Sequence, residues 1–576
     1  MGINGKDLMI SGGKSMEKKG LSRRDFLKGT VAGTVGISAV GLLGACATQE
    51  TGGNAEQKTE QTEKVIQTSW KTPPQAITDF VDTINTEVLV VGAGNAGMFA
   101  ACAAAEKGAK VTVIERNAMI GMGREWIGGV GTRLQKEAGV NVNKFEIIEE
   151  LSRYASNRVD QRLLKLWVDY SGPTMDWLEN VVKEYGSYMV LETDTGEETH
   201  GVYKTYAIQH NIQNQEKPIE STHILKEKAQ ALGVEILLDT PMVQLIRENN
   251  NTGKVAGAIA KTKSGHIKIV AGKGTILCTG GYSNNREMLE ELNPLAVQSC
   301  VGTASHAGSK GDGIKAATWV GAAKDDVPTV MIFDRCTIIA GTDGKDWSKA
   351  MWLHMGSQPF LKVNGQGERF ANESTPYDFI VHAASLQPGD RYCMIWDGNW
   401  KEQTRQFHTI GCSRLQYSKS GSKLMLFDEN ATEGMHNGTL LPQGFIVESD
   451  TLEGLAEKLK LPVDTFVKTV RRYNELCSKG VDEDFGKESY RMLALEKPPY
   501  RGALMGGQLL CTLDGLRVNT SLQVLDTNLE PIEGLYAAGN DSGGFFADNY
   551  PEYIIGCASG RTTTFGRLAG QIVASL

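Results

Sequence analysis

Three glycines are spaced so that the backbone can close on a phosphate group. Gly92, Gly94 and Gly97 stand in the pattern G-x-G-x-x-G directly after a run of apolar residues at 87–91. The first glycine permits a tight turn, the second lets the backbone approach a pyrophosphate, and the third lets the following helix pack closely. The turn therefore predicts a dinucleotide site, with the phosphates at the N-terminus of a helix.

The elements expected around this turn are those that such a site requires. Residues 87–91 are predicted to form a buried strand, an alanine-rich helix runs to residue 107, and a second strand covers 110–114. Glu115 closes the second strand, where it is placed to accept hydrogen bonds from an adenosine ribose. This βαβ unit predicts nucleotide binding, but it does not distinguish FAD from NAD.

Residues near the N-terminus predict export. Arg23 and Arg24 stand in the sequence S-R-R-D-F-L-K, which is typical of a twin-arginine signal. A moderately apolar run over 31–43 is too short for a membrane span and suits a signal peptide. Small residues before Cys46 form a lipobox, which predicts lipidation of this cysteine and anchoring on the extracytoplasmic face of the cell membrane. An accidental arginine pair in a cytoplasmic protein is the alternative.

The N-terminal region divides into two expected parts. A signal is expected over 1–46, with translation starting at either Met1 or Met16. Residues 47–80 are rich in Thr, Gln, Glu, Lys and Gly and show no apolar periodicity, so a flexible tether is expected there. The rest of the chain is long enough for two domains with large cores.

Charge and cysteine spacing exclude several function classes. The net charge of −8 argues against nucleic acid as a partner. The ten cysteines contain no Cys-x-x-Cys pair and the nine histidines no His-Glu-x-x-His motif, so we expect no metal site, iron–sulfur cluster or attached haem. No second apolar run reaches 18 residues, so no membrane-spanning helix is expected.

Four segments, in order along the chain, resemble the fumarate reductase/succinate dehydrogenase flavoprotein superfamily. They are T-I-L-C-T-G-G-Y-S-N-N at 275–285, G-S-K-G-D-G at 308–313, G-L-Y-A-A-G-N at 534–540 and G-R-L-A-G at 566–570. The resemblance implies FAD as the cofactor and an α/β fold. It implies a Rossmann-like FAD-binding domain split into 81–328 and 512–576, with an α+β capping domain inserted at 329–511.

The glycine turn and the resemblance together indicate the residues that would contact FAD. Asn540 replaces a family glutamate, which is expected to alter the contact with the ribityl chain without abolishing FAD binding. The expected cofactor-binding residues are Gly92, Ala93, Gly94, Asn95, Ala96, Gly97, Glu115, Arg116, Arg124, Gly128, Gly129, Val243, Thr279, Gly280, Gly281, Asp312, Gly539, Asn540 and Ala558.

Three positions that bind substrate in the fumarate reductases hold other residues here. Those enzymes clamp a dicarboxylate with arginines and histidines, and an arginine donates a proton. By resemblance, Tyr377 occupies the position of the proton-donating arginine in R-F-A-N-E-S-T-P-Y. Tyr553 occupies that of a carboxylate-binding arginine and Cys511 that of a histidine. We therefore expect a substrate other than fumarate.

Paired tyrosines resemble a different branch, the 3-ketosteroid dehydrogenases and related enone-reducing flavoproteins. That resemblance implies that Tyr377 donates or accepts a proton. It also implies that a second tyrosine and the N–H of Gly556 polarise a substrate carbonyl, and a small alignment slip leaves both Tyr553 and Tyr550 open for this role. Donors preorganised at such an oxygen typically stabilise the transition state by about 3–4 kcal/mol each.

Two further residues are assigned to the site by resemblance. Glu373 is expected to hold the substrate-contacting residues in place without touching the substrate. His354 lies near the family's proton-relay segment, and the alternative is that this histidine has only a structural role.

The pattern as a whole predicts an exported FAD-dependent reductase acting on an activated C=C bond of a small organic electron acceptor, in anaerobic respiration. A separate redox partner, either a quinol-linked cytochrome or an FMN protein, is expected because the sequence carries no haem motif. Two alternatives stay open: a dehydrogenase of the 3-ketosteroid type that passes electrons to quinone, and a non-catalytic lipoprotein that carries FAD.

Overall fold

The predicted phosphate turn lies at the carboxyl end of a strand in a parallel sheet. β1 (Asp82–Val91) pairs in parallel with β2 (Val111–Ile114) on one side and with β11 (Gly265–Leu277) on the other. The helix α2 (Asn95–Glu106) follows the turn. The strand, helix and strand expected from the sequence are therefore confirmed within a few residues.

The computed structural model describes residues 69–576, apart from 125, 194–198, 201–202, 215–220 and 416–426. The predicted signal, with Arg23, Arg24 and Cys46, lies outside the described residues. The end of the predicted tether, over 69–80, is described. There Trp70 is buried and its indole N–H donates to the Glu291 carboxylate at 2.6 Å.

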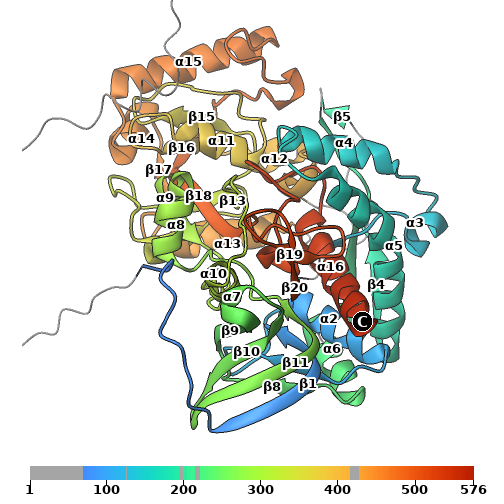
Figure 1. The fold of residues 1–576 in the computed structure, drawn as a ribbon. Coiled ribbons are helices and arrows are strands. Elements are labelled where there is room, and N and C mark those ends of the chain that lie inside the picture. The colour runs from blue at the N-terminus through green and yellow to red at the C-terminus, as the bar shows by residue number, and fades with distance from the viewer. Residues whose placement is uncertain (1–68, 125, 194–198, 201–202, 215–220, 416–426) are drawn as a thin grey trace, which may run out of the picture. The chain divides into compact units, whose positions relative to one another are not determined.

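The parallel sheet joins segments from both ends of the chain (Figure 1). Its strands follow the order β19–β20–β11–β1–β2–β8, with an antiparallel β9–β10 extension from β11. Parallel pairing aligns Leu535 of β20 with Thr275 of β11. The predicted FAD-binding fold, split in sequence, is thereby confirmed. The bounds not yet given are β8 (Glu235–Leu237), β9 (Met242–Arg247), β10 (Val255–Thr262), β19 (Gln523–Leu525) and β20 (Pro531–Ala537).

The last helix closes this part of the fold. Figure 1 shows α16 (Cys557–Ala574), in red, beside α2, in blue. A Cβ atom at Gly566 would come within 2.3 Å of the Ala96 carbonyl oxygen, and one at Gly570 within 2.2 Å of that of Ala100. Glycine is therefore required at both positions for this close helix packing.

A second sheet forms most of the predicted cap. Its long central strand, β18 (Tyr500–Thr512), pairs with β13, β16, β12 and β17. β12 joins this sheet although it precedes residue 329, the expected start of the cap. The other strands are β12 (Cys300–Thr303), β13 (Val330–Ile338), β14 (Met351–Trp352), β15 (Leu361–Asn364), β16 (Tyr392–Trp396) and β17 (Val447–Ser449).

The remaining elements surround these two sheets. A small antiparallel sheet has the order β3–β7–β4, and no helix among the described residues is both long and apolar enough to cross a membrane. The small strands are β3 (Trp126–Gly128), β4 (Ser187–Leu191), β5 (Thr199–His200), β6 (Tyr203–Lys204) and β7 (Gln209–Asn214). The other helices are α3 (Arg133–Glu137), α4 (Lys144–Tyr154), α5 (Gln161–Glu184), α6 (Ser221–Ala231), α7 (Glu248–Asn251), α8 (Arg286–Leu292), α9 (Pro294–Ser299), α10 (Asp312–Trp319), α11 (Tyr377–Ala384), α12 (Trp400–Gln406), α13 (Glu429–Met435), α14 (Leu452–Leu459) and α15 (Val463–Lys479).

Candidate active site

The three positions of the phosphate turn hold glycine for three different structural reasons. Gly92 has a φ of +104°, in the region that favours glycine. A Cβ atom at Gly97 would lie 1.8 Å from the Gly92 carbonyl oxygen, so the helix could not pack against the turn with any side chain there. A Cβ atom at Gly94 would meet no described atom within 4 Å. The space beside Gly94 is therefore left open, on the side where the motif places a pyrophosphate.

The predicted ribose acid is held in place by the turn itself. The N–H of Ala93 donates to Oε2 of the buried Glu115 at 2.9 Å. The side-chain amide of Asn117 donates to Oε1 at 2.8 Å. These bonds orient the carboxylate, and its remaining lone pairs are able to accept hydrogen bonds from hydroxyl groups.

The turn fits the nucleotide part of FAD. Asn95 begins α2, and its buried Oδ1 has no hydrogen-bond partner among the described residues. The first N–H groups of a helix have no intrahelical partner and favour an anion. Together with the open space at Gly94 and the oriented Glu115, these groups match a dinucleotide diphosphate.

One residue of the cofactor region was missed by the sequence analysis. Asp541 follows β20 and is completely buried. Its carboxylate accepts hydrogen bonds from the N–H groups of Thr279 and Gly281 and from the Thr279 hydroxyl at 3.0 Å. It thereby ties the turn after β11 to the turn after β20. An acid next to the G-L-Y-A-A-G-N strand was the available signal, but its partners lie 260 and 262 residues away.

Other predicted cofactor residues line the same region through main-chain contacts. The N–H of Gly128 donates to the Gly556 carbonyl at 2.8 Å. The N–H of Gly129 donates to the Ile208 carbonyl at 2.9 Å. Gly539 has a φ of +64°, and a Cβ atom built there would lie 3.0 Å from the Cβ atom of Ala96. The turn after β20 therefore reaches the start of α2.

The remaining predicted cofactor residues lie on several different elements. Arg116 forms an ion pair with Asp312 at 2.5 Å, at the start of α10. Val243 lies on β9, and Arg124 is exposed. Gly280, with a φ of +88°, shares its turn with Thr279 and Gly281.

Tyr377 is the first residue of α11 and is buried, with 1% of its surface exposed. Its hydroxyl has no hydrogen-bond partner among the described residues. The Phe333 ring packs edge-on against it at 4.8 Å. Burial raises the pKa of Tyr377 well above its usual value, and Cys412 and Tyr550 nearby raise it further. The phenol therefore keeps its proton at neutral pH.

Tyr550 is brought to the same place by the loop before α16. It is 1% exposed, and burial followed by the neighbouring Cys412 raises the pKa of Tyr550 well above its usual value. A hydrogen bond from the N–H of Ala558, in the first turn of α16, partly opposes this shift. Tyr550 therefore lies near enough to Tyr377 to raise the pKa of that tyrosine, and its own phenol lies by the N-terminus of α16.

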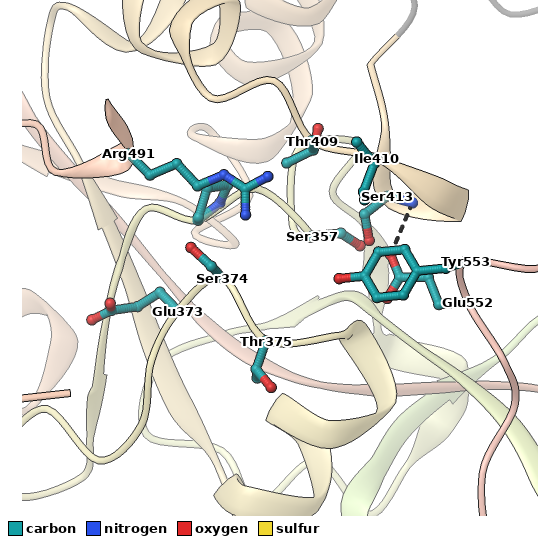
Figure 2. Close-up of a pocket in the computed structure, with 11 residues that line it drawn as sticks. Ser357, Glu373, Ser374, Thr375, Thr409, Ile410, Ser413, Arg491, Glu552 and Tyr553 are labelled. Carbon is teal, nitrogen blue, oxygen red and sulfur yellow. Dashed lines mark hydrogen bonds between the residues drawn. The ribbon is translucent and has the colours of Figure 1, made fainter. Parts of the chain in front are cut away.

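Tyr553, the other predicted second tyrosine, lines a separate small pocket (Figure 2). Its ring packs edge-on against Tyr154 at 6.4 Å. Burial raises the pKa of the Cys412 thiol to about 11. The N–H of Gly556 donates a hydrogen bond to this thiol and partly opposes the shift. The pocket is lined by Ser357, Pro359, Glu373, Ser374, Thr375, Thr409, Ile410, Ser413, Arg491, Glu552 and Tyr553.

Glu552 connects this pocket with the tyrosines. Its Oε1 accepts from the N–H of Ser413 at 3.1 Å and its Oε2 from the N–H of Tyr377 at 2.8 Å. Figure 2 shows the Ser413 bond beside Tyr553. Burial raises the pKa of Glu552 to about 7 despite these two bonds. This carboxyl, which sequence reasoning missed, can therefore hold or release a proton near neutral pH.

The two supporting residues predicted from the sequence have different surroundings. The Glu373 carboxylate pairs with Arg369 at 2.8 Å and with Lys487 at 3.6 Å. Burial alone would raise the pKa of Glu373, but Lys487 and Arg369 hold it below its usual value. Burial lowers the pKa of His354 to about 4, with a further contribution from Arg335, so this imidazole is neutral at pH 7.

Comparison with known proteins identifies the sequence family. The model of the FAD binding domain family matches residues 87–552. The vinyl phenol reductase of Lactiplantibacillus plantarum is 30% identical over 84% of this chain and 95% of its own length. A probable fumarate reductase of Shewanella frigidimarina is 27% identical over 84% of this chain and 74% of its own.

The fold agrees with that of solved structures. The open conformation of a flavocytochrome c3 fumarate reductase matches 88% of this chain and 82% of its own, with a TM-score of 0.63 and 25% identity. The resemblance stated from the four sequence segments is thereby confirmed.

Proposed function

The chain belongs to the FAD binding domain family, within the fumarate reductase/succinate dehydrogenase flavoprotein superfamily, and we propose that it reduces an activated C=C bond of a small organic acceptor. As a member of this family it is an FAD-dependent oxidoreductase. The relatives include reductases named for vinyl phenol and for fumarate. Because these names cover different substrates, family membership supports alkene reduction but does not select the acceptor.

The proposal rests on the hydroxyl of Tyr377, which is buried and bonds to none of the described residues. Reduced FAD, when bound by the residues described above, would supply the hydride for one alkene carbon, and negative charge would develop toward the electron-withdrawing group. Tyr377 protonates the other carbon, and its raised pKa keeps the proton in place until that moment. Tyr550, next to the N-terminus of α16, donates a hydrogen bond to the atom that gains the charge.

Reprotonation of Tyr377 needs a route because its hydroxyl is buried. Glu552 lines the polar pocket and accepts a hydrogen bond from the backbone N–H of Tyr377, and its pKa of about 7 suits a group that exchanges protons at neutral pH. Waters in that pocket, lined by Ser374 and Thr375, would supply Glu552.

The proposed location and electron source rest on the N-terminal sequence. Twin-arginine export and lipidation at Cys46 would hold the enzyme outside the cytoplasm, where a quinol-linked cytochrome or an FMN protein would deliver electrons for anaerobic respiration. Cell fractionation tests this directly. Arg23→Lys with Arg24→Lys should retain the protein in the cytoplasm, and Cys46→Ser should release it from the membrane. An unchanged distribution in both variants would contradict the proposal.

The reaction is tested by anaerobic reoxidation of the reduced holoenzyme. The flavin absorbance is followed after adding cinnamate, cinnamamide, urocanate, fumarate or a steroid enone. Rapid reoxidation by at least one alkene, with formation of the saturated product, is expected. If no alkene reoxidises the flavin while a saturated ketosteroid reduces the oxidised enzyme, the protein is a dehydrogenase instead.

A further inference from the structure

One face of β7 carries amide side chains that are buried. Alternate residues of a strand point to the same face, so Gln209, Asn211 and Gln213 lie together. Their exposed fractions are 4%, 0% and 5%. The opposite face holds His210 and Ile212, and Ile212 belongs to the main apolar core. Buried amide groups are nearly always hydrogen-bonded, so the atoms on the first face are expected to have partners.

A buried carboxylate satisfies part of this face. Oε1 of Glu192 accepts from Nδ2 of Asn211 at 2.7 Å, and Oε2 accepts from Nε2 of Gln209 at 2.8 Å. Arg414, from the cap, forms an ion pair with the same carboxylate through Nη2. The two opposite charges are paired, so this cluster of amides and ions carries no net charge.

Three polar atoms of the cluster have no hydrogen-bond partner among the described residues. They are Oδ1 of Asn211, Nε2 of Gln213 and Nε of Arg414, and all three are buried. The set offers one acceptor and two donors. A buried polar atom without a partner is costly, so these three positions indicate a polar group that is supplied from outside the chain.

A hydroxyl group matches the three atoms in number and kind. It has one O–H donor and two acceptor lone pairs. The donor fits Oδ1 of Asn211, and the lone pairs fit Nε2 of Gln213 and Nε of Arg414. A carboxylate has no donor for Asn211 and would add a charge to a buried cluster that is already neutral, whereas an ammonium group has no acceptor. The cluster therefore selects a neutral hydroxyl.

The cluster is joined to the residues proposed for alkene reduction by a short turn of the cap. Arg414 directly follows the 3₁₀ turn η2 (Gly411–Ser413). In that turn the N–H of Ser413 donates to Oε1 of Glu552 at 3.1 Å. The other oxygen of this carboxylate accepts from the N–H of Tyr377 at 2.8 Å. One molecule that reaches from the alkene site past this turn would meet the cluster.

The small sheet also reaches the cofactor region. Gln209 lies opposite Gly128 of β3, and the N–H of Gly128 donates to the Gly556 carbonyl just before α16. Trp126 lies opposite Asn211, so the half-buried indole belongs to the amide face. This ring adds a flat apolar surface beside the amides, and such a surface suits the ring of an aromatic ligand.

We propose that Asn211, Gln213 and Arg414 bind a hydroxyl group that the acceptor carries at the end remote from its alkene. The inference rests on the proposed function and adds a specificity site to it. With the alkene at Tyr377, the hydroxyl supplies the missing partners of the three atoms. A methyl group in its place has a similar size but leaves those atoms unbonded, so the site discriminates against the methyl analogue.

The test compares a hydroxyl group with a methyl group. Binding of 3-(4-hydroxyphenyl)propanamide and 3-(4-methylphenyl)propanamide to the oxidised holoenzyme is measured by calorimetry and by the flavin spectrum, together with the isomers substituted at ring position 3. Binding is the primary readout, because a ring hydroxyl also changes the reactivity of an alkene. Reduction of the corresponding cinnamamides gives kcat and KM. Wild type should bind the better hydroxyl isomer at least about tenfold more tightly than its methyl counterpart.

A matched pair of variants locates the preference. Gln213→Met removes the amide and keeps the length of the side chain. Gln403 is also 5% exposed and also has one unpartnered amide atom, Oε1, but it lies on α12 of the cap, so Gln403→Met is the control. The preference for hydroxyl should fall close to parity in Gln213→Met and stay at the wild-type value in Gln403→Met. Melting of each flavin-loaded variant confirms that it is folded.

The outcomes separate the inference from the function beneath it. Equal binding of hydroxyl and methyl compounds by the wild type would overturn the inference and leave alkene reduction standing. An unchanged preference in folded Gln213→Met, or its loss in both variants, would do the same. Should Gln213→Met fail to fold, Gln213→Leu is judged by the same criteria. Failure of every alkene above to reoxidise the flavin would overturn the proposed function and this inference with it.

Discussion

The backbone N–H of Tyr377 donates a 2.8 Å hydrogen bond to the Glu552 carboxylate, which lies 175 residues later in the chain. The neighbouring pair is reciprocal, because the N–H of Tyr550 donates to the Asp378 carboxylate at 3.2 Å. Two adjacent residues at the start of α11 thus bond crosswise to the loop before α16. This arrangement brings the cap and the cofactor fold together at the two phenols.

Replacement of Tyr377 by phenylalanine should separate catalysis from stability. The hydroxyl bonds to no residue that the structure describes, so its removal should leave the melting temperature nearly unchanged. Loss of the proton donor should lower turnover by about 100-fold or more. Tyr392→Phe is a matched control, since that tyrosine is equally buried, also lacks a partner and belongs to the apolar core of the cap. Normal turnover in Tyr377→Phe would exclude this residue as the donor.

Glu552 should make both activity and stability depend on pH. Its pKa in the fold is about 7, above the ordinary value of 4.5, so the folded protein binds the extra proton between these values. Its contribution to stability is therefore complete below about pH 4.5 and is lost as the pH rises through about 7. In Glu552→Gln, the unfolding free energy should fall less between pH 5 and 7.

In Glu552→Gln, turnover should no longer change as the pH passes through about 7. Chemical denaturation at several pH values measures the first effect and steady-state kinetics the second. Glu533→Gln, at an exposed position on β20, serves as the control. A Glu552→Gln profile identical to that of the wild type would remove Glu552 from the proton route.

Alanine at Gly94 and at Gly97 should have opposite consequences. A Cβ at Gly94 meets no described atom, so the apoprotein should fold normally while its FAD dissociation constant rises by at least about tenfold. A Cβ at Gly97 would collide with the Gly92 carbonyl, so that variant should lose stability even without FAD. Flavin stoichiometry and apoprotein melting distinguish the two. Normal FAD affinity in Gly94→Ala would mean that the pyrophosphate binds elsewhere.

Asp541→Asn should weaken the turns around the cofactor. The carboxylate accepts from the N–H groups of both Thr279 and Gly281, whereas an asparagine offers one oxygen and turns an NH₂ group toward the other donor. One buried N–H is left without a partner, at a cost of about 1–3 kcal/mol. Denaturant unfolding and flavin content should both decline. Asp343→Asn, at an exposed acid, should change neither.

The sequence alone determined the cofactor fold. The glycine turn, the strands beside it and the distant G-L-Y-A-A-G-N strand could be predicted because each depends on local backbone requirements or on apolar runs. Even the split of the fold could be anticipated, since β20 carries a recognisable pattern and pairs with β11. The start of the second sheet differed from the expected start of the cap at residue 329, because β12, which precedes that residue, pairs with β18.

Only the tertiary structure decided which side chains meet. The resemblance placed Tyr553 at the family position and left Tyr550 open through a small alignment slip, but the loop before α16 turns Tyr550 toward Tyr377 and Tyr553 toward Tyr154. Asp541 and Glu552 carried no motif. Their roles arise from partners far away in the chain. Side-chain direction depends on where loops and bulges turn the backbone, and residue spacing does not record that.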